Sequence, residues 1–271
     1  MKLSLVIPCY NEENTLCGIV DEVLKLRDHG AELELVIVDD CSKDGSWCVA
    51  KDIADKHPAM IKLCRHDVNR GKGAALRTGF LEATGDYVGV QDADLEYDPL
   101  DYLKLLECAR KEQADVVYGS RYLRLGSRRV LRWWHSTMNR FLTLMSNMFS
   151  DLEITDMETC YKMFRREVIQ EIAPLLKEDR FGFEPEVTSH VARLMRFKGI
   201  KVGEVAISYR PRTFMEGKKI GWKDGVRALW CIAKYNAPVM PLPVQVLIYL
   251  TGAFIVFAVF GVIMNIVLWF R

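Results

Sequence analysis

Short apolar runs alternate with helix-length amphipathic segments over the first 120 residues. Four runs have the length and composition of buried parallel strands: Leu3 to Ile7, Leu33 to Val38, Tyr87 to Val90 and Val116 to Tyr118. Amphipathic stretches such as Glu13 to Leu26 and Ala74 to Ala83 lie between them. This rhythm predicts an α/β, Rossmann-like fold with a mostly parallel sheet, flanking helices and ligands at the carboxyl ends of the strands.

Residues 121–243 are less regular and more basic. From Trp134 to Met148 apolar residues recur at helical spacing, with basic side chains on the other faces. This helix either packs on the sheet or lies in the lipid headgroup layer with its tryptophans at the interface. The same choice applies to Ile220 to Tyr235, where we favour membrane contact because the next segment is strongly apolar.

A long uncharged segment runs from Val244 to Phe270. It is long enough to cross the roughly 30 Å hydrocarbon layer as one tilted helix, and a buried core helix seldom stays apolar on all sides for so long. Five basic residues precede it, and only Arg271 follows. The apolar length therefore predicts a single-pass membrane protein. The positive-inside tendency predicts that the domain before the span is cytosolic.

Composition narrows the classes of protein. Of the 271 residues 27% are charged, which excludes both a disordered polymer and a fully embedded membrane protein. The net charge of +1 gives no basic field for a nucleic-acid partner. The eight cysteines lack CxxC spacing, so they favour small core residues in a reducing compartment over zinc ligands or disulfides. The apolar run at Met1 is too short for a signal peptide.

The strongest chemical signal is Asp92-Ala93-Asp94, directly after the apolar run that ends at Val90. Two carboxylates spaced by one residue at a strand end can converge on a hard cation, and that cation would bridge the phosphates of a nucleotide diphosphate. Such a pair is also common on solvated loops. Its place after a buried strand favours the functional interpretation.

The first two predicted strands also end in chemistry-bearing residues. Asp39 and Asp40 follow Val38, where they could hydrogen-bond a nucleotide's base or ribose. Tyr10, Asn11 and Glu12 follow the first strand and offer an aromatic face and an acid. The alternative is local structure, with Asn11 capping a helix and acids in its first turn.

A third pattern is Asn69-Arg70-Gly71-Lys72-Gly73, which combines a flexible backbone with cations and precedes a helix. That combination suits phosphate binding. The segment lacks the full spacing of a Walker loop, so it gives little support for an ATPase.

These motifs, together with Val6-Ile7-Pro8-Cys9-Tyr10-Asn11-Glu12 and Gly119-Ser120-Arg121-Tyr122, occur in the order seen in family 2 glycosyltransferases of the GT-A fold. The chain most resembles the branch with dolichol-phosphate mannose synthases and polyprenyl-phosphate glucosyltransferases, from Lys2 to about Tyr235. With the resemblance and the apolar C-terminal run taken together, we expect a nucleotide-sugar-binding half (1–120), an acceptor half with membrane-interface helices (121–235), and a linker with a transmembrane helix (236–271).

The resemblance also implies roles for single residues. Pro8, Tyr10, Glu12 and Asp39 would line the nucleotide pocket, with Asn11, Asp40, Arg70, Gly71 and Lys72 in the neighbouring loops. Asp92 and Asp94 would serve the metal and the sugar, and Arg121 would hold the acceptor phosphate. Glu96 stands where the mannose synthases have glutamine. As a carboxylate it remains a ligand for Mg²⁺ or Mn²⁺.

Two segments further along resemble the acceptor side of bacterial members of this branch. They place Asp156 and Glu184 near the sugar. Arg210, Arg212, Lys218 and Lys219 lie in the segment that forms a loop over the bound substrates in such enzymes. The alternative is a solvated basic loop, but the nearby anchor favours contact with a lipid phosphate.

The resulting hypothesis is metal-dependent, inverting transfer of mannose or glucose from GDP-mannose or UDP-glucose to a polyprenyl phosphate, dolichyl or undecaprenyl. A second hypothesis is transfer to a sugar hydroxyl of a polysaccharide or glycolipid, which would need a carboxylate base near the acceptor. A third is an inactive nucleotide-binding scaffold, against which the intact acid pair argues. The anchors allow a homo-oligomer, but no heptad or small-residue pattern in the sequence predicts one.

Overall fold

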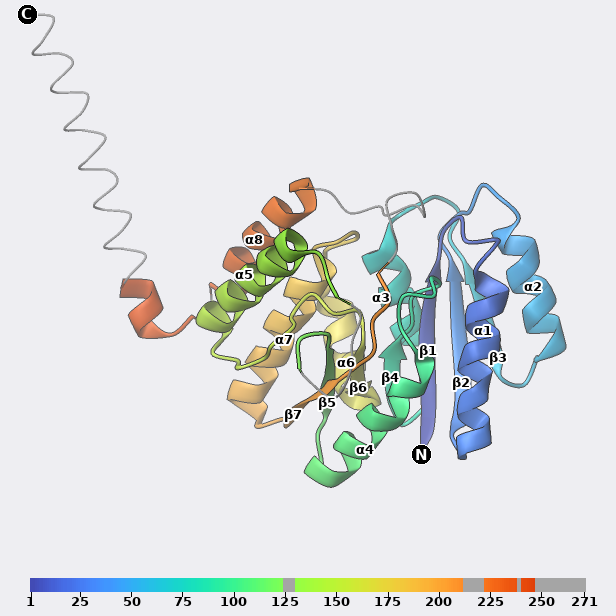
Figure 1. The fold of residues 1–271 in the computed structure, drawn as a ribbon, viewed down its shortest axis with the longest axis horizontal. Coiled ribbons are helices and arrows are strands. Elements are labelled where there is room, and N and C mark those ends of the chain that lie inside the picture. The colour runs from blue at the N-terminus through green and yellow to red at the C-terminus, as the bar shows by residue number, and fades with distance from the viewer. Residues whose placement is uncertain (124–129, 212–221, 238–239, 247–271) are drawn as a thin grey trace, which may run out of the picture.

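Seven strands form one sheet at the centre of the protein (Figure 1). The computed structural model describes residues 1–123, 130–211, 222–237 and 240–246. The strands are β1 (Lys2–Cys9), β2 (Glu32–Asp39), β3 (Ile61–Arg65), β4 (Tyr87–Val90), β5 (Val116–Ser120), β6 (Lys162–Arg165) and β7 (Val202–Ala206). Their order is β3-β2-β1-β4-β6-β5-β7, and β6 alone among them runs antiparallel to its neighbours.

Helices cover both faces of the sheet. They are α1 (Leu16–Leu24), α2 (Ser46–Lys56), α3 (Lys72–Glu82), α4 (Tyr102–Glu112), α5 (Trp133–Ser150), α6 (Arg166–Ile172), α7 (Phe183–Lys198) and α8 (Trp222–Asn236), with short 3-10 helices η1 (Lys25–His29), η2 (Pro99–Asp101) and η3 (Ala173–Leu175). One hydrophobic cluster lies under α1, α2 and α4, and a second lies under α3, α6 and α7. The predicted α/β class with a mostly parallel sheet is confirmed.

The alternation of side chains along β1 explains the two clusters. Leu3, Leu5 and Ile7 are buried in the first cluster, whereas Val6 points to the opposite face and joins the second. Successive strand residues face opposite sides, so a strand covered on both faces must be apolar throughout. Each fully buried Leu, Ile or Val contributes about 1.5–3 kcal/mol relative to an exposed one.

Three of the seven strands were not predicted from the apolar runs. β3 lies at one edge of the sheet and β7 at the other, and both carry polar or half-exposed residues. β6 has only four residues and begins with a lysine. Short strands with charges give no continuous apolar run, so the periodicity could not identify them.

The helix α5 buries polar side chains and exposes large aromatic ones, the opposite of an ordinary surface helix. Its buried residues include Asn139, Thr143 and Ser146, whereas Trp133 is 65% exposed and Trp134 is 79% exposed. The helix lies beside α7 and α8 (Figure 1), and Trp230 of α8 is likewise 59% exposed. The helix therefore packs on α7 and α8 and presents tryptophan side chains outward, and its contact with lipid stays a prediction.

Most of the predicted membrane span, from Val244 to Phe270, lies outside the described residues, which end at 246. Within the ranges that the structure covers, no helix has both the length and the hydropathy needed to cross a bilayer.

Candidate functional site

The loops that follow β1 and β2 are bonded to each other at the carboxyl edge of the sheet. Asn11 donates its backbone N–H to Ser42 Oγ at 3.0 Å, and its Oδ1 accepts from the Lys43 N–H at 2.8 Å. Asn11 and Cys41 both adopt positive φ, 54° and 60°, which ordinary L-residues seldom do. Asn11 thus joins the two loops, a role that neither the ligand nor the helix-cap interpretation included.

The other residues after β1 lie beside this junction. Pro8 is opposite Val38 in the sheet register, and the half-buried Tyr10 follows the strand end. Glu12 donates its backbone N–H to Ser46 Oγ at 2.7 Å, and its Oε2 accepts from Thr15 Oγ1 at 2.8 Å. The sheet therefore brings Pro8, Tyr10 and Glu12 to the same edge as the end of β2.

Asp39 and Asp40 are both buried but have different surroundings. Asp39 accepts from Arg65 Nε at 3.1 Å. Asp40 is surrounded by protein donors: its oxygens accept from the backbone N–H groups of Arg70 at 2.9 Å and Gly71 at 2.7 Å, and lie 2.7 Å from His66 Nδ1. Asp40 therefore shapes the loop before α3, whereas Asp39 lies directly at the strand end.

The glycines of the loop before α3 are explained by close packing. A Cβ on Gly71 would lie 2.4 Å from the Asp179 carbonyl oxygen, and one on Gly73 would lie 2.1 Å from that of Glu178. The Gly73 N–H already donates to the Asp179 oxygen at 2.9 Å. The N–H groups of Gly73 and Ala74 are thus satisfied within the chain, and phosphate binding by this motif stays a prediction. The exposed Arg70 and the side chain of Lys72 remain the cationic parts of this motif.

Lys72 reaches the acid pair after β4. Its Nζ lies 2.7 Å from Asp92 Oδ1, 3.7 Å from Glu184 Oε1 and 3.1 Å from Cys160 Sγ. Burial alone would raise the pKa of Asp92, but the Lys72 ammonium outweighs it and holds that pKa below its ordinary value. Asp92 is therefore kept ionised near neutral pH.

The loop from Asp94 to Tyr97 pairs with the segment after β7. Asp94 Oδ1 accepts from the Glu96 N–H at 3.2 Å, and Glu96 Oε2 accepts from Tyr209 Oη at 2.9 Å. The Glu96 carbonyl accepts from the backbone N–H of Arg210, an exposed residue, at 2.8 Å, and Tyr97 forms a β-bridge with Tyr209. The Glu96 carboxylate, which stands where the mannose synthases have glutamine, thus has a specific partner in the Tyr209 hydroxyl.

Arg121 and Asp156 form a buried ion pair beside this loop. Arg121 Nε lies 2.7 Å from Asp156 Oδ2 and Nη2 lies 2.8 Å from Oδ1, so the contact is bidentate. Asp156 is fully buried, and the Arg121 guanidinium lies 5.2 Å from the Tyr209 ring centroid. Tyr209 therefore contacts both Arg121 and Glu96, which connects the predicted acceptor residue to the predicted metal residues.

Two charged residues near Asp156 have roles that the sequence did not suggest. Lys162, at the start of β6, is fully buried and donates to the Met157 carbonyl at 2.9 Å and to the Thr159 carbonyl. Burial and the nearby Glu184 carboxylate raise the pKa of Glu158 to about 8. Glu158 Oε1 is buried without a hydrogen-bond partner among the described residues. In the sequence these two residues look like an ordinary acid and an ordinary lysine. The burial of Lys162 and of the Glu158 oxygen arises only when β6 enters the sheet in the reversed direction.

We expect Glu158→Gln to flatten the pH dependence of stability. The pKa of Glu158 is raised on folding, so its stabilising contribution is complete below the unfolded value of 4.5 and is lost as pH rises through about 8. Thermal unfolding at pH 6 and pH 9 should therefore show a larger fall in Tm for the native chain than for the variant. Glu153→Gln, at an exposed position nearby, is the control. Equal falls in all three proteins would contradict the assignment.

The residues predicted to bind metal fit Mg²⁺ or Mn²⁺ in their chemistry, because Asp92, Asp94 and Glu96 offer hard carboxylate oxygens. No three His, Cys, Asp or Glu side chains converge as a ready-made cation site in the parts of the chain that the structure covers. Asp92 Oδ1 is instead paired with the Lys72 ammonium. The acids after β4 are thus suitable ligands that do not yet form a coordination shell.

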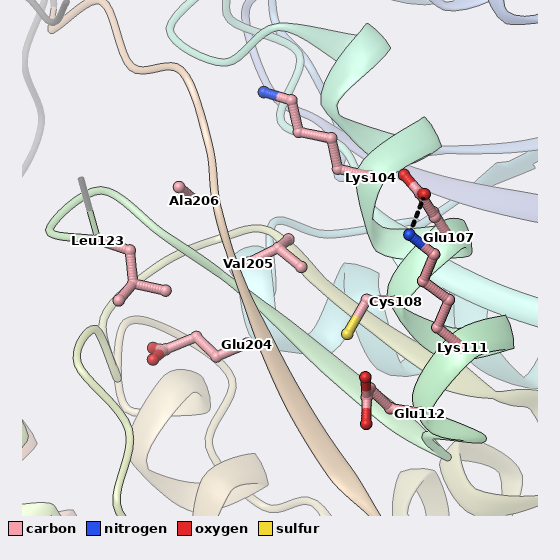
Figure 2. Close-up of a pocket in the computed structure, with 9 residues that line it drawn as sticks. All are labelled: Lys104, Glu107, Cys108, Lys111, Glu112, Leu123, Glu204, Val205 and Ala206. Atoms are coloured by element: carbon pink, nitrogen blue, oxygen red, sulfur yellow. Dashed lines mark ion pairs between the residues drawn. The ribbon is translucent and has the colours of Figure 1, made fainter. Parts of the chain in front are cut away.

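Arg212 and Lys219, together with Lys218, lie outside the described residues. A pocket of about 500 Å³ lies elsewhere, between α4 and β7 (Figure 2). Cys108 and Val205 line it, and Lys104, Glu107 and Lys111 stand at its α4 side. None of the predicted site residues lines this pocket, so the candidate site is placed by the chemistry of the strand ends.

Comparison with known proteins finds a matching family model and curated relatives. The family model described as "Glycosyl transferase family 2" matches residues 4–173, which include both the acid pair after β4 and the Arg121–Asp156 pair. A dolichol-phosphate mannosyltransferase of Pyrococcus furiosus is 39% identical over 129 residues, 46% of this chain and 35% of that protein. A dolichyl-phosphate beta-glucosyltransferase of Dictyostelium discoideum is 28% identical over 80% of this chain and 68% of its own length.

A solved structure supports the fold. Glucosyl-3-phosphoglycerate synthase from Mycobacterium tuberculosis, crystallised with Mn²⁺, uridine diphosphate and phosphoglyceric acid, superposes with a TM-score of 0.62. It is 18% identical, and the match covers 89% of this chain and 79% of that one. Similarity at this level of identity establishes a shared GT-A-like architecture.

Proposed function

Because the chain belongs to glycosyl transferase family 2, we propose that it transfers a hexose from a nucleotide diphosphate sugar to the phosphate of a polyprenyl carrier. The carrier is suggested by the dolichol-phosphate enzymes that it resembles. The hexose is mannose or glucose, carried by GDP or UDP. Transfer inverts the anomeric carbon, since the acceptor oxygen displaces the nucleotide directly.

One observation carries the proposal: the acid pair follows β4 at the edge where β1 and β2 also end, and Lys72 lies 2.7 Å from its first member. A nucleotide diphosphate is a polyanion with hydroxyl-rich ends, so it needs cations beside hydrogen-bond acceptors. Tyr10 and Asp39 offer a ring and an acid for the nucleoside at the same edge. Lys72 and Asp92 offer opposite charges for the diphosphate and the sugar.

The chain's own residues would act mainly by positioning and charge. Lys72 keeps Asp92 ionised, so that Asp92 can accept hydrogen bonds from sugar hydroxyls. When bound by Asp92, Asp94 and Glu96, Mg²⁺ or Mn²⁺ would stabilise the charge of the departing nucleotide. An acceptor phosphate is already anionic near neutral pH, so a strong general base is unnecessary. Catalysis then rests on orientation and electrostatic stabilisation.

The acceptor phosphate would be met by Arg121 and by the basic residues from Arg210 onward. Asp156 already binds Arg121 through two nitrogen atoms. The pair is therefore electrically balanced, and a phosphate would approach the part of the guanidinium that Asp156 does not cover. Arg210, Arg212 and Lys219 would supply the additional positive charge.

The acceptor lipid requires that the site lie at a membrane surface, and the outward aromatic faces of α5 and α8 favour this. Trp133, Trp134 and Trp230 are exposed, while the buried face of α5 is largely polar. Tryptophan is the residue best suited to the boundary between headgroups and acyl chains. We therefore propose that these two helices rest on the bilayer and that the apolar segment from Val244 to Phe270 anchors the chain in it.

The test is sugar transfer by the purified full chain. Radiolabelled GDP-mannose and UDP-glucose are each incubated with vesicles that carry polyprenyl phosphate, with and without EDTA. We expect labelled lipid from one of the two donors and almost none after chelation, because the metal would be needed to stabilise the departing nucleotide. Sedimentation of the same vesicles should bring the protein down with them.

Each other outcome supports a rival. Transfer to a glycolipid hydroxyl without any labelled polyprenyl phosphate would favour the second hypothesis. Nucleotide binding without transfer to any acceptor would favour an inactive scaffold. Full activity in EDTA would contradict the metal dependence while leaving the transferase intact.

A further inference from the structure

Residues 176–182, which we call the bracket, connect η3 to α7 and carry a buried acid outside the described site. The Glu178 side chain is only 7% exposed. Its carboxylate accepts from Arg227 Nε at 3.0 Å and Nη2 at 2.7 Å, and from Tyr235 Oη at 2.9 Å. Lys234 Nζ lies 3.5 Å away. All of these partners belong to α8, so Glu178 fastens the bracket to that helix.

The backbone of the bracket holds the start of α3. The Asp179 carbonyl accepts from the N–H groups of Gly73 at 2.9 Å and Ala74 at 3.3 Å. Arg77, one turn further along α3, donates to Asp179 Oδ1 at 2.6 Å and to the Leu176 carbonyl at 2.9 Å. Lys72 is the first residue of α3, so the bracket fixes the position of the Lys72 backbone from which its side chain extends.

The bracket also holds the start of α7. Glu186, in the first turn of that helix, accepts from the N–H groups of Lys177 and Glu178, each at 2.8 Å. Glu184 lies in the same turn and reaches Lys72 at 3.7 Å. Lys72, which pairs with Asp92, and Glu184, which reaches Lys72, therefore come from two helix starts that one short segment holds together.

We propose that Glu178 is a positioning residue for the catalytic edge. By fixing the bracket to α8, it sets Lys72 at its distance from Asp92 and Glu184 at its distance from Lys72. The inference rests on the proposed function only in that Asp92 is taken to face the donor. Glu178 itself touches none of the reacting groups, so its effect passes through the backbone of residues 177–179.

Hydrogen exchange of the full chain without substrate tests the positioning directly. In Glu178→Gln, which keeps the volume but removes the charge, we expect amides at the start of α3, residues 73–76, to exchange about tenfold faster. Arg227→Met breaks the same contact from α8 and should give the same local change, and its side chain is half exposed, so folding should tolerate it. Lys198→Met, which removes an exposed ion pair with Glu171, is the matched control.

Turnover is the second measurement. A positioning role predicts that kcat falls about tenfold in both variants, while the donor KM stays within about twofold and Tm within a few degrees. Unchanged or uniformly raised exchange would overturn the proposal, and so would faster local exchange with native kcat. If the native chain transfers no sugar, the proposed function fails, and the exchange result alone decides whether Glu178 positions the helix starts.

Discussion

Replacing Asp94 with alanine is expected to leave a folded protein that transfers almost no sugar. Asp94 is half-buried in the loop after β4. This loop stays paired with the segment after β7 through the hydrogen bond from the Arg210 N–H to the Glu96 carbonyl. The fold therefore should not depend on the Asp94 carboxylate. Loss of a group that stabilises charge at the reacting centre typically costs about 10²- to 10³-fold in kcat. Initial rates of labelled lipid formation at saturating donor measure the effect.

Two further variants separate charge from shape at this position. Asp94→Asn keeps the acceptor oxygen for the Glu96 N–H but removes the charge, so it should be nearly as inactive as Asp94→Ala. Glu107→Ala, which removes an exposed acid paired with Lys111 on α4, should leave the rate unchanged. Native turnover in Asp94→Asn would show that the charge is not needed, and the metal assignment would then be wrong.

Replacing Arg121 with methionine is expected to destabilise the protein strongly as well as to abolish transfer. Asp156 is fully buried and would lose the guanidinium that now binds it through two nitrogen atoms, which leaves an uncompensated acid in the interior. Removing one member of a buried pair typically costs about 3–5 kcal/mol in the free energy of unfolding. Urea unfolding followed by circular dichroism measures the loss.

A double variant distinguishes a structural pair from a functional one. Arg121→Met combined with Asp156→Leu removes both charges, and replacing a buried pair with apolar residues is often neutral for stability. The double variant should therefore regain most of the lost unfolding free energy while transfer stays absent. Recovery of both properties would mean that Arg121 does not take part in the reaction.

Most of the first half of the chain was predictable from the sequence because β1, β2 and β4 are buried on both faces. Val36 and Val38 could be assigned to a strand from their apolar surroundings alone, and the acids after it then fell at the carboxyl edge. The roles of those acids were less accessible. Asp40 looks like a ligand in the sequence, yet its partners are His66 and the backbone N–H groups of Arg70 and Gly71.

The second half was harder because its chemistry precedes a strand. β6 runs antiparallel, so the residues that enter it, including Cys160, reach the catalytic edge, and no apolar run stands before them. The rule that ligand residues follow strands therefore missed Lys162. Tyr209 was missed for another reason: its importance lies in the contacts with Arg121 and Glu96, which spacing along the chain does not encode.

The reversal of β6 also has a consequence for how such a protein can diversify. β5 leaves the sheet and β6 re-enters it at the same edge, with Tyr118 opposite Lys162 in the register. Residues 121–161 therefore form an excursion between two neighbouring strand ends. Changes in the length of such an excursion cost little closure entropy and do not shift the strands. If residues 1–120 bind the donor as proposed, new acceptors could be recruited by changing this excursion while the donor half is inherited intact.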